Sequence, residues 1–354
     1  MQTPFDRLVH DAIEGGVTAL LSMQDADGLW REFDLKPGAS QAWTTAWVGW
    51  CLRRCMGQAA CTSGGVVPGW ATAARQRALA DACGRAARAV IALRGPRGWG
   101  YNRASGGDAD STAWVLRFLA ACGAGMDPLP WLAPYVDAAG GVHTFVDEGH
   151  GRWTDAHDDV AATVGLALLH GPASRPLARR IAAGLAHRWP VRTFWWSTPA
   201  YGRAWCLRLL AALPGGGAPA ALQVEALSWL RSQPAPTDAF EAAHRLMMAT
   251  QLGDRRRADV LATQLLDLAN SDGRPGGWPG ACHLLVPSRD DGDDGADGAD
   301  DADTPHREIR GLLSTSLSVM ALTEFVAGHE KTPGREAQGF CSAPPPGGEA
   351  RRMS

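Results

Sequence analysis

Apolar residues in this chain gather into short stretches in which nearly every position is apolar. Six such stretches cover residues 42–52, 111–121, 160–169, 201–213, 240–252 and 313–325. A helix that is apolar on every side is a helix buried on every side. The pattern therefore predicts six buried helices.

A longer segment precedes each apolar stretch, with apolar residues at three- and four-residue intervals and arginines between them. The clearest runs from Ala74 to Arg94, where Leu79, Cys83, Ala86, Val90 and Leu93 follow one stripe. This is the pattern of a helix with one buried face. The others cover about 5–23, 129–140, 173–188, 219–232 and 255–270.

Six hairpins, each an amphipathic helix followed by a buried one, predict an all-α fold, a single (α/α)6 barrel. Strand-like alternation is almost absent. We expect the barrel to cover residues 1–328, with an acidic low-complexity loop at about 288–305 and a disordered tail at 329–354.

The loop between the two helices of a hairpin repeats a glycine and a tryptophan. The first copy holds Gln24, Gly28 and Trp30, and the frame returns as Asp147, Gly151, Trp153 and as Asp272, Gly276, Trp278, with a blurred copy at 94–100. The glycine permits a tight turn, and the indole can stack on the neighbouring repeat.

Two aspartates, Asp108 and Asp110, stand directly before the second apolar stretch, in the segment DADSTAW. Aspartate and serine are common helix N-caps, so capping alone explains the pattern. A carboxylic acid at a helix N-terminus, beside a like charge and away from water, can also donate a proton. The motif fits both roles.

These motifs resemble those of squalene–hopene and oxidosqualene cyclases. The Gln24–Trp30 frame is similar to their QW repeat, and DADSTAW to the D-x-D-D-T-A motif of class II (protonation-initiated) terpene cyclases. The resemblance implies cyclisation or isomerisation of an isoprenoid or another alkene-containing substrate. It implies Asp110 as the proton donor and Asp108 as its anchoring partner, with Ser111 at the fourth motif position, where the family pattern has aspartate.

The resemblance implies no cofactor, and magnesium only if the substrate is a diphosphate. Squalene-type cyclases use two barrels, whereas this chain supplies one. A lone barrel also resembles the β-subunit of protein prenyltransferases, which binds zinc and pairs with a second subunit.

Aromatic and polar residues at the starts of the buried stretches are candidate substrate contacts. Indole rings can stabilise a carbocation, and a charged funnel mouth would suit a substrate with a polar or anionic head. The candidates are Trp43, Trp47, Trp114, Trp196, Tyr201, Arg203, His157, Asp158, Glu241, His244 and Arg310. Core packing, helix capping and surface ion pairs are the alternative roles.

Two other functions remain open. Cys206, Cys282 and His283 faintly resemble the zinc ligands of lanthionine cyclases, another (α/α)6 family, so one alternative is a zinc-dependent barrel of the prenyltransferase or lanthionine-cyclase type. The other is a non-catalytic barrel that binds lipid or serves as a subunit. A DDxxD sequence at Asp290–Asp294 lies in the acidic loop, where a magnesium site would lack rigidity.

The composition limits the binding partners and the cellular location that we expect for this protein. The net charge of -3 means that the chain has no excess of basic residues with which to bind nucleic acid. No apolar run reaches 18 residues, and the N-terminus lacks the pattern of a signal peptide. Scattered cysteines are typical of reduced thiols, and the excess of arginine over lysine is typical of a GC-rich bacterial gene. We expect a cytoplasmic bacterial enzyme of natural product biosynthesis, a monomer or one of two subunits, with membrane contact at most peripheral.

Overall fold

The computed structural model describes residues 3–60, 72–147, 149–215, 217–269, 276–288 and 304–329. The acidic segment 289–303, with its DDxxD sequence, and the tail from residue 330 lie outside these ranges. None of the helices in the described ranges combines the length and the apolar character needed to cross a bilayer.

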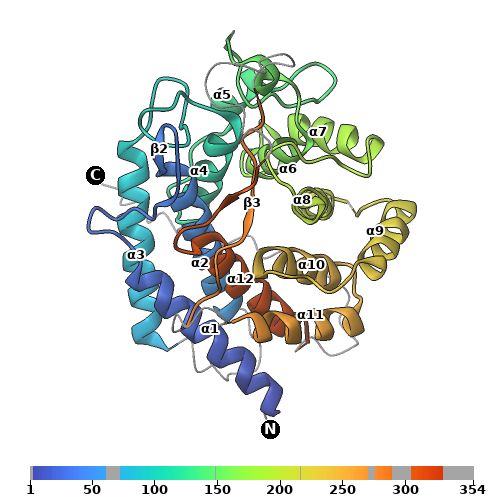
Figure 1. Cartoon of the computed structure of the whole chain (residues 1–354). Coiled ribbons are helices and arrows are strands. Elements are labelled where there is room, and N and C mark those ends of the chain that lie inside the picture. Colours follow the sequence, from blue (N-terminus) through green and yellow to red (C-terminus); the bar gives the residue numbers. More distant parts are fainter. Residues whose placement is uncertain are drawn as a thin grey trace, which may run out of the picture.

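A closed ring of helices forms the inside of the molecule (Figure 1). Each helix packs on the next, and the last packs on the first. In ring order they are α2 (Ala42–Ala60), α4 (Ala109–Ala121), α6 (Asp158–Leu168), α8 (Pro199–Ala212), α10 (Ala239–Gln251) and α12 (Leu312–His329). These are the six apolar stretches, so the predicted all-α barrel is confirmed.

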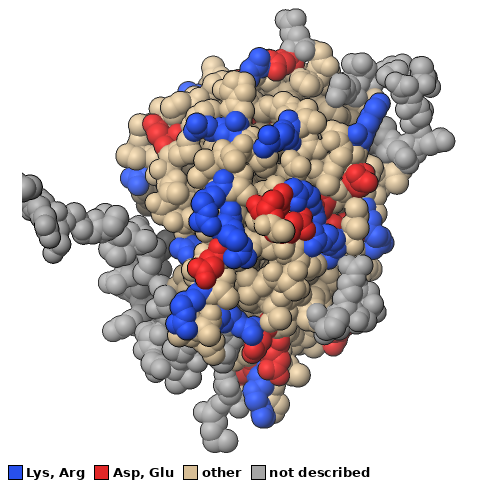
Figure 2. Space-filling view, turned by 90° about the vertical axis from the view of Figure 1, so that its left-hand side faces the viewer, with Lys and Arg blue, Asp and Glu red and all other residues tan. Residues whose placement is uncertain are grey.

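The amphipathic helices surround this ring. They are α1 (Pro4–Ser22), α3 (Ala73–Ala92), α7 (Arg175–His187), α9 (Ala220–Ser232) and α11 (Arg255–Leu268). On α1, Val9, Ile13, Val17 and Leu20 are buried, as expected of one stripe. The opposite faces carry charge, and Figure 2 shows basic residues among acidic residues on the side of the molecule where α3 lies.

The third outer helix differs from the prediction. Instead of a helix over 129–140 the chain forms one α-helical turn, α5 (Leu129–Leu132), and a 3-10 turn, η2 (Ala133–Tyr135). Pro128, Pro130 and Pro134 explain the difference, because proline has no backbone N–H to donate and disfavours helical geometry in the residue before it. A second 3-10 turn, η3 (Gly151–Thr154), precedes α6.

Each of three tryptophans forms hydrogen bonds to both an outer helix and the inner helix of the same hairpin. In each, the indole Nε1 donates to a carbonyl near the end of the outer helix, and the backbone N–H donates to a threonine hydroxyl of the inner helix. The sets are Trp30 with Leu20 (2.8 Å) and Thr45 (2.9 Å), Trp99 with Val90 (2.7 Å) and Thr112 (3.0 Å), and Trp278 with Leu265 (2.7 Å) and Thr315 (3.1 Å).

Trp153 does not repeat this pattern. Its indole donates to a carbonyl of the segment between α11 and α12, and its side chain is half-buried. Gly151 has a positive φ (+51), but Gly140 (φ +85) matches Gly28 (φ +86) more closely, and buried Val142 follows Gly140 as Trp30 follows Gly28. The third copy of the frame therefore lies about eleven residues before the predicted one, with valine in place of tryptophan.

Two short antiparallel hairpins lie in the loops. One pairs β1 (Glu32–Leu35) with β2 (Gly38–Ser40), and the other pairs β3 (Cys282–Leu284) with β4 (His306–Arg307). Residues 279–288, which we call the crossing segment, contain β3 and reach across the ring in Figure 1. Their backbone bonds Trp195 and Ser197 in the loop before α8.

Candidate active site

The beginnings of the inner helices lie at one end of the barrel, because each inner helix except α6 follows an outer helix that runs in the opposite direction. The crossing segment lies at this end, since it bonds the loop that leads into α8. Helix N-termini carry partial positive charge, so this end favours carboxylates.

Asp108 is the N-cap of α4. Its Oδ1 accepts from the Ser111 backbone N–H (2.6 Å), and its Oδ2 accepts from the Ser111 hydroxyl (2.7 Å). The carboxyl is buried, and burial raises its pKa to about 6 against these hydrogen bonds. Ser111, the departure from the cyclase motif, thus anchors Asp108.

Asp110 lies in the first turn of α4 and faces the ring interior. The Trp43 indole Nε1 donates to its Oδ2 (2.9 Å), and the Thr163 hydroxyl lies 2.7 Å from its Oδ1. Asp110 keeps some accessible surface, while the residues from Ser111 to Leu119 are all buried.

The pKa of the Asp110 carboxyl is raised to about 7, chiefly by burial and in part by the charge of Asp108, against the bonds from Thr163 and Trp43. The Thr163 hydroxyl also lies 2.9 Å from the Val160 carbonyl, which can only accept. With its hydrogen on that carbonyl, Thr163 accepts the proton of a neutral Asp110. With its hydrogen turned to Asp110, it stabilises the carboxylate.

Asp159, at the start of α6, is a third buried carboxyl. Its Oδ2 accepts from the backbone N–H groups of Phe194 (2.8 Å) and Trp195 (2.9 Å). Burial raises its pKa to about 7, and the charge of Asp110 contributes. Asp159 thus fixes the loop that presents the next residue, Trp196, to the barrel interior.

Rings from several inner helices meet next to Asp110. We call this the aromatic cluster; it consists of Trp43, Trp47, Trp114, Trp196, Tyr201, Trp205, Phe240 and His244. Trp43, which bonds the acid, has its ring centroid 5.9 Å from Trp196 and 6.2 Å from Trp47. Asp110 is therefore linked through Trp43 to a closely packed group of rings.

Several polar atoms in this cluster are buried without a hydrogen-bond partner in the described part of the chain. They are the indole Nε1 atoms of Trp47 and Trp205, and His244 Nε2. Native structures hold few such groups, and an unpaired one often marks a functional site.

A buried cation lies deeper in the barrel. Arg117, two turns after Asp110 on α4, places its guanidinium carbon 4.2 Å from the ring centroids of Trp50 and Trp114 and 4.8 Å from Trp205. Burial lowers the pKa of this guanidinium, but arginine stays protonated at neutral pH.

Comparison with solved structures supports the same fold. Neither a protein-family model nor a curated protein matches the chain. The type II terpene cyclase MstE from Scytonema, in complex with geranylgeranyl dihydroxybenzoate, has a TM-score of 0.73 and 20% identity over 92% of this chain and 99% of that one. This chain has the fold of a type II terpene cyclase.

Two further structures share this terpene cyclase fold. A protein from Actinoplanes has a TM-score of 0.69 and 24% identity, over 89% of this chain and 98% of that one. The ent-copalyl diphosphate synthase from Streptomyces platensis has a TM-score of 0.52 and 18% identity, over 80% of this chain and 50% of that one. A single barrel thus corresponds to the whole of MstE and to half of the synthase.

The structure brings together Trp43, Trp47, Trp114, Trp196, Tyr201 and His244 of the predicted substrate contacts. It does not bring the charged ones to the aromatic cluster, because each is held elsewhere. Asp158 pairs with Arg188, Arg203 with Glu225, Glu241 with Arg245 and Arg310 with Asp25, while His157 stacks on Phe194. Arg203 and Arg310 therefore do not form a common anion site.

The residues considered as zinc ligands are also apart. Cys206 is buried in α8. His283 lies in the crossing segment, where its imidazole bonds Ser197 and Asp238. The Cys282 thiol donates to the Pro305 carbonyl. Among the described residues, no three side chains with suitable donors meet to hold a metal ion.

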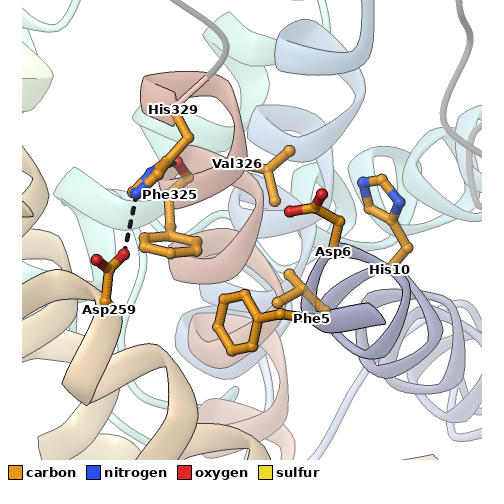
Figure 3. A pocket seen from close by; sticks show the side chains of 8 residues that line it. Phe5, Asp6, His10, Asp259, Phe325, Val326 and His329 are labelled. Carbon is orange, nitrogen blue, oxygen red and sulfur yellow. Dashed lines mark hydrogen bonds and ion pairs between the residues drawn. The ribbon is translucent and has the colours of Figure 1, made fainter. Parts of the chain in front are cut away.

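A pocket of about 260 Å³ lies on the outside, between α1, α11 and α12. Figure 3 shows Phe5, Asp6 and His10 facing Asp259, Phe325 and His329. Phe325 and His329 are near the end of α12, so the pocket lies at the barrel end opposite Asp110. It is separate from the aromatic cluster.

The raised pKa of Asp110 predicts a pH-dependent stability difference between the wild type and Asp110→Asn. In the folded wild type the protonated carboxyl is favoured, so its contribution is complete below the unfolded pKa of 3.8 and is lost as the pH rises through about 7. Asparagine does not titrate. As the pH rises from 4 to 8, the unfolding free energy of the variant should therefore increase by roughly 2–4 kcal/mol relative to that of the wild type.

Denaturant unfolding of both proteins at pH 4.5, 6 and 8 measures this difference. Comparing the two proteins cancels the histidines, several of which have lowered pKa values and titrate with the opposite sign. A difference that stays constant across these pH values would mean that Asp110 ionises as it does in water.

Proposed function

We propose that this protein is a protonation-initiated (class II) terpene cyclase with Asp110 as its acid. The observation that carries the proposal is a carboxyl with a pKa raised to about 7, bonded by Trp43 and Thr163 and bordering a cluster of aromatic rings. In this role Asp110 adds its proton to the terminal alkene of an isoprenoid chain. The electrons of the next double bond then attack the carbocation and close a ring.

The surroundings of Asp110 suit proton donation. The raised pKa keeps a large fraction of the acid protonated at neutral pH. When the proton leaves, the Trp43 N–H, the Thr163 hydroxyl and the N-terminus of α4 are already placed to stabilise the carboxylate. Preformed donors need no reorganisation during the reaction.

The aromatic cluster suits the cation that follows. The π faces of Trp43, Trp47 and Trp196 attract positive charge without acting as nucleophiles. Buried rings also exclude water, which would otherwise capture the cation as an alcohol. The proton gained from Asp110 is balanced by one lost from another carbon, so the product is an isomer of the substrate.

The head of the substrate is better matched by a neutral or aromatic group than by a diphosphate. Arg203 and Arg310 are engaged by Glu225 and Asp25, and the described residues offer no acidic metal site. MstE binds a geranylgeranyl chain on a dihydroxybenzoate, which supports a prenylated aromatic acid as the first substrate to test. We also propose that the enzyme needs no cofactor and acts in a bacterial cytoplasm, a setting that the free thiols of the described cysteines support.

The test is incubation of the protein in D2O with a panel of isoprenoids. The panel holds C10 to C20 prenyl diphosphates, the matching alcohols, prenylated hydroxybenzoates and squalene. We expect one member to give a cyclic product that carries one deuterium from solvent. Asp259→Asn, a change at the exposed pocket of Figure 3, is the control that keeps the activity. If no member of the panel is cyclised, the protein is better explained as a lipid-binding barrel.

A further inference from the structure

Two histidines of the barrel follow a phenylalanine by four residues. His244 follows Phe240 on α10, and His329 follows Phe325 on α12. In both, imidazole Nδ1 lies at hydrogen-bond distance from the phenylalanine carbonyl, 2.9 Å and 3.0 Å respectively. A carbonyl only accepts, so Nδ1 carries a hydrogen in both residues. When the ring is neutral, Nε2 keeps its lone pair.

The two residues differ at Nε2. His329 lies in the outer pocket, where its Nε2 is 3.0 Å from an Asp259 carboxylate oxygen (Figure 3). His244 is fully buried, and its Nε2 has no partner in the described part of the chain. The same local motif therefore gives an ion pair at the surface and an unengaged lone pair inside the barrel.

The surroundings of His244 are aromatic. Its ring centroid lies 4.5 Å from Phe240, 5.4 Å from Tyr201, 6.2 Å from Trp205 and 6.4 Å from Trp47. Burial lowers the pKa of this imidazole to about 3, so it is neutral at physiological pH. In the aromatic cluster it is a side chain that can accept a proton and is not already protonated.

The ring order places His244 opposite the acid. In the sequence α2, α4, α6, α8, α10, α12, two helices separate α4 from α10 in either direction. Trp47 connects the two sides, because its ring contacts both Trp43, which bonds Asp110, and His244. The contacts of Trp47 thus connect the side of the cluster that bonds Asp110 with the side that holds His244.

We propose that His244 Nε2 is the base that ends the reaction, an assignment that rests on the proposed function. The C–H bond next to the cationic carbon breaks, and its electron pair forms the final double bond. The proton goes to the Nε2 lone pair and gives an imidazolium. Asp110 has lost one proton and His244 has gained one, and exchange with solvent after product release restores both.

The test compares product distributions of the wild type, His244→Gln and His329→Gln. Without its base, His244→Gln should still consume substrate but release the cation by other routes, as a different alkene isomer or as an alcohol formed by water. We expect the ratio of the wild-type alkene to these products to fall at least about tenfold, since a general base contributes about 10²- to 10⁴-fold. His329→Gln changes the same motif and should give the wild-type ratio.

Running the reaction in D2O distinguishes this test from the test of the proposed function. Deuterium at the protonated carbon reports on the acid step, whereas the product ratio reports on the base. A labelled product in His244→Gln shows that the acid step works whatever happens to the base. If that labelled product is the wild-type alkene in the wild-type proportion, His244 is not the base.

A second measurement needs no substrate and holds if the variant fails to fold. Nitrogen NMR of histidine-labelled wild-type protein should show His244 as a neutral ring with a protonated Nδ1 and an unprotonated Nε2 from pH 8 to pH 5. A hydrogen on Nε2, or a charged ring at pH 7, overturns the proposal.

Discussion

Asp110→Asn is expected to lower kcat by at least about 10³-fold, within the range of a lost general acid. Asparagine keeps the shape of the site, because its oxygen can accept from the Trp43 indole and its amide can donate to the Thr163 hydroxyl. It has no proton acidic enough for an alkene. Single-turnover rates on the substrate found in the panel would measure the loss, and KM should change by no more than a few-fold.

The wild-type rate gives a second measure of the same acid. Because the protonated form of Asp110 is the active one, kcat should fall as the pH rises through about 7. Asp108→Asn keeps a cap on α4 but removes the nearby charge that raises the pKa of Asp110, so the fall should begin at lower pH. If Asp110→Asn retains more than about a tenth of the wild-type rate, the proton comes from another group, and Asp159 becomes the first candidate.

Trp99→Ala is expected to have the largest effect on stability, a loss of about 3–5 kcal/mol of unfolding free energy. The ring is buried, and its indole N–H holds a carbonyl in the last turn of α3 while its backbone N–H holds Thr112 on α4. Trp99→Phe keeps most of the apolar volume and should lose about 0.5–1.5 kcal/mol, the net contribution of one hydrogen bond, because the Val90 carbonyl still accepts from the Leu93 N–H. Denaturant unfolding measures both.

Trp153→Ala is the matched comparison. This tryptophan is half-buried and bonds the crossing segment instead of an outer helix. Its loss should cost clearly less stability than the loss of Trp99. Equal costs would mean that the glycine–tryptophan frame does not fasten the hairpins.

Much of the barrel can be predicted from the chain, because hydrophobic pattern and burial are directly linked. The second buried stretch was expected at 111–121, and α4 covers Ala109–Ala121. The prediction fails at 129–140, where the apolar pattern continues but three prolines remove N–H donors. Apolar periodicity reports which residues can be buried, and it does not report whether the backbone can close helical hydrogen bonds.

The residue proposed as the acid can also be found in the sequence, because Asp108 and Asp110 stand at the local start of a helix. Its partners are not. Thr163 lies on α6 and Trp43 on α2, and their bonds to Asp110 exist only because the ring brings α2, α4 and α6 together. Trp43 was predicted to contact substrate, and the structure makes it a hydrogen-bond donor to the acid.

The charged candidate residues show a second limit of prediction from the sequence, which concerns the direction in which a side chain points. Arg203 begins an inner helix, which suggested a place at the funnel mouth. A helix that is apolar on every side has no polar face to indicate its rotation, so the sequence cannot tell whether a given side chain faces the barrel axis or the outer layer. In the structure Arg203 turns to the outer layer, over the Trp229 ring of α9.

Arg117 makes the barrel electrically asymmetric along its axis. Seven residues of α4 separate it from Asp110, about 10 Å at the rise of an α-helix. Its guanidinium already occupies the ring faces of Trp50, Trp114 and Trp205, so these faces are taken before any substrate arrives. In the proposed reaction, a hydrocarbon cation would therefore be attracted by the ring faces near Asp110 and repelled by the Arg117 guanidinium deeper in the barrel. The depth at which these two forces balance would limit how far charge can travel along the substrate, and so how many rings can form.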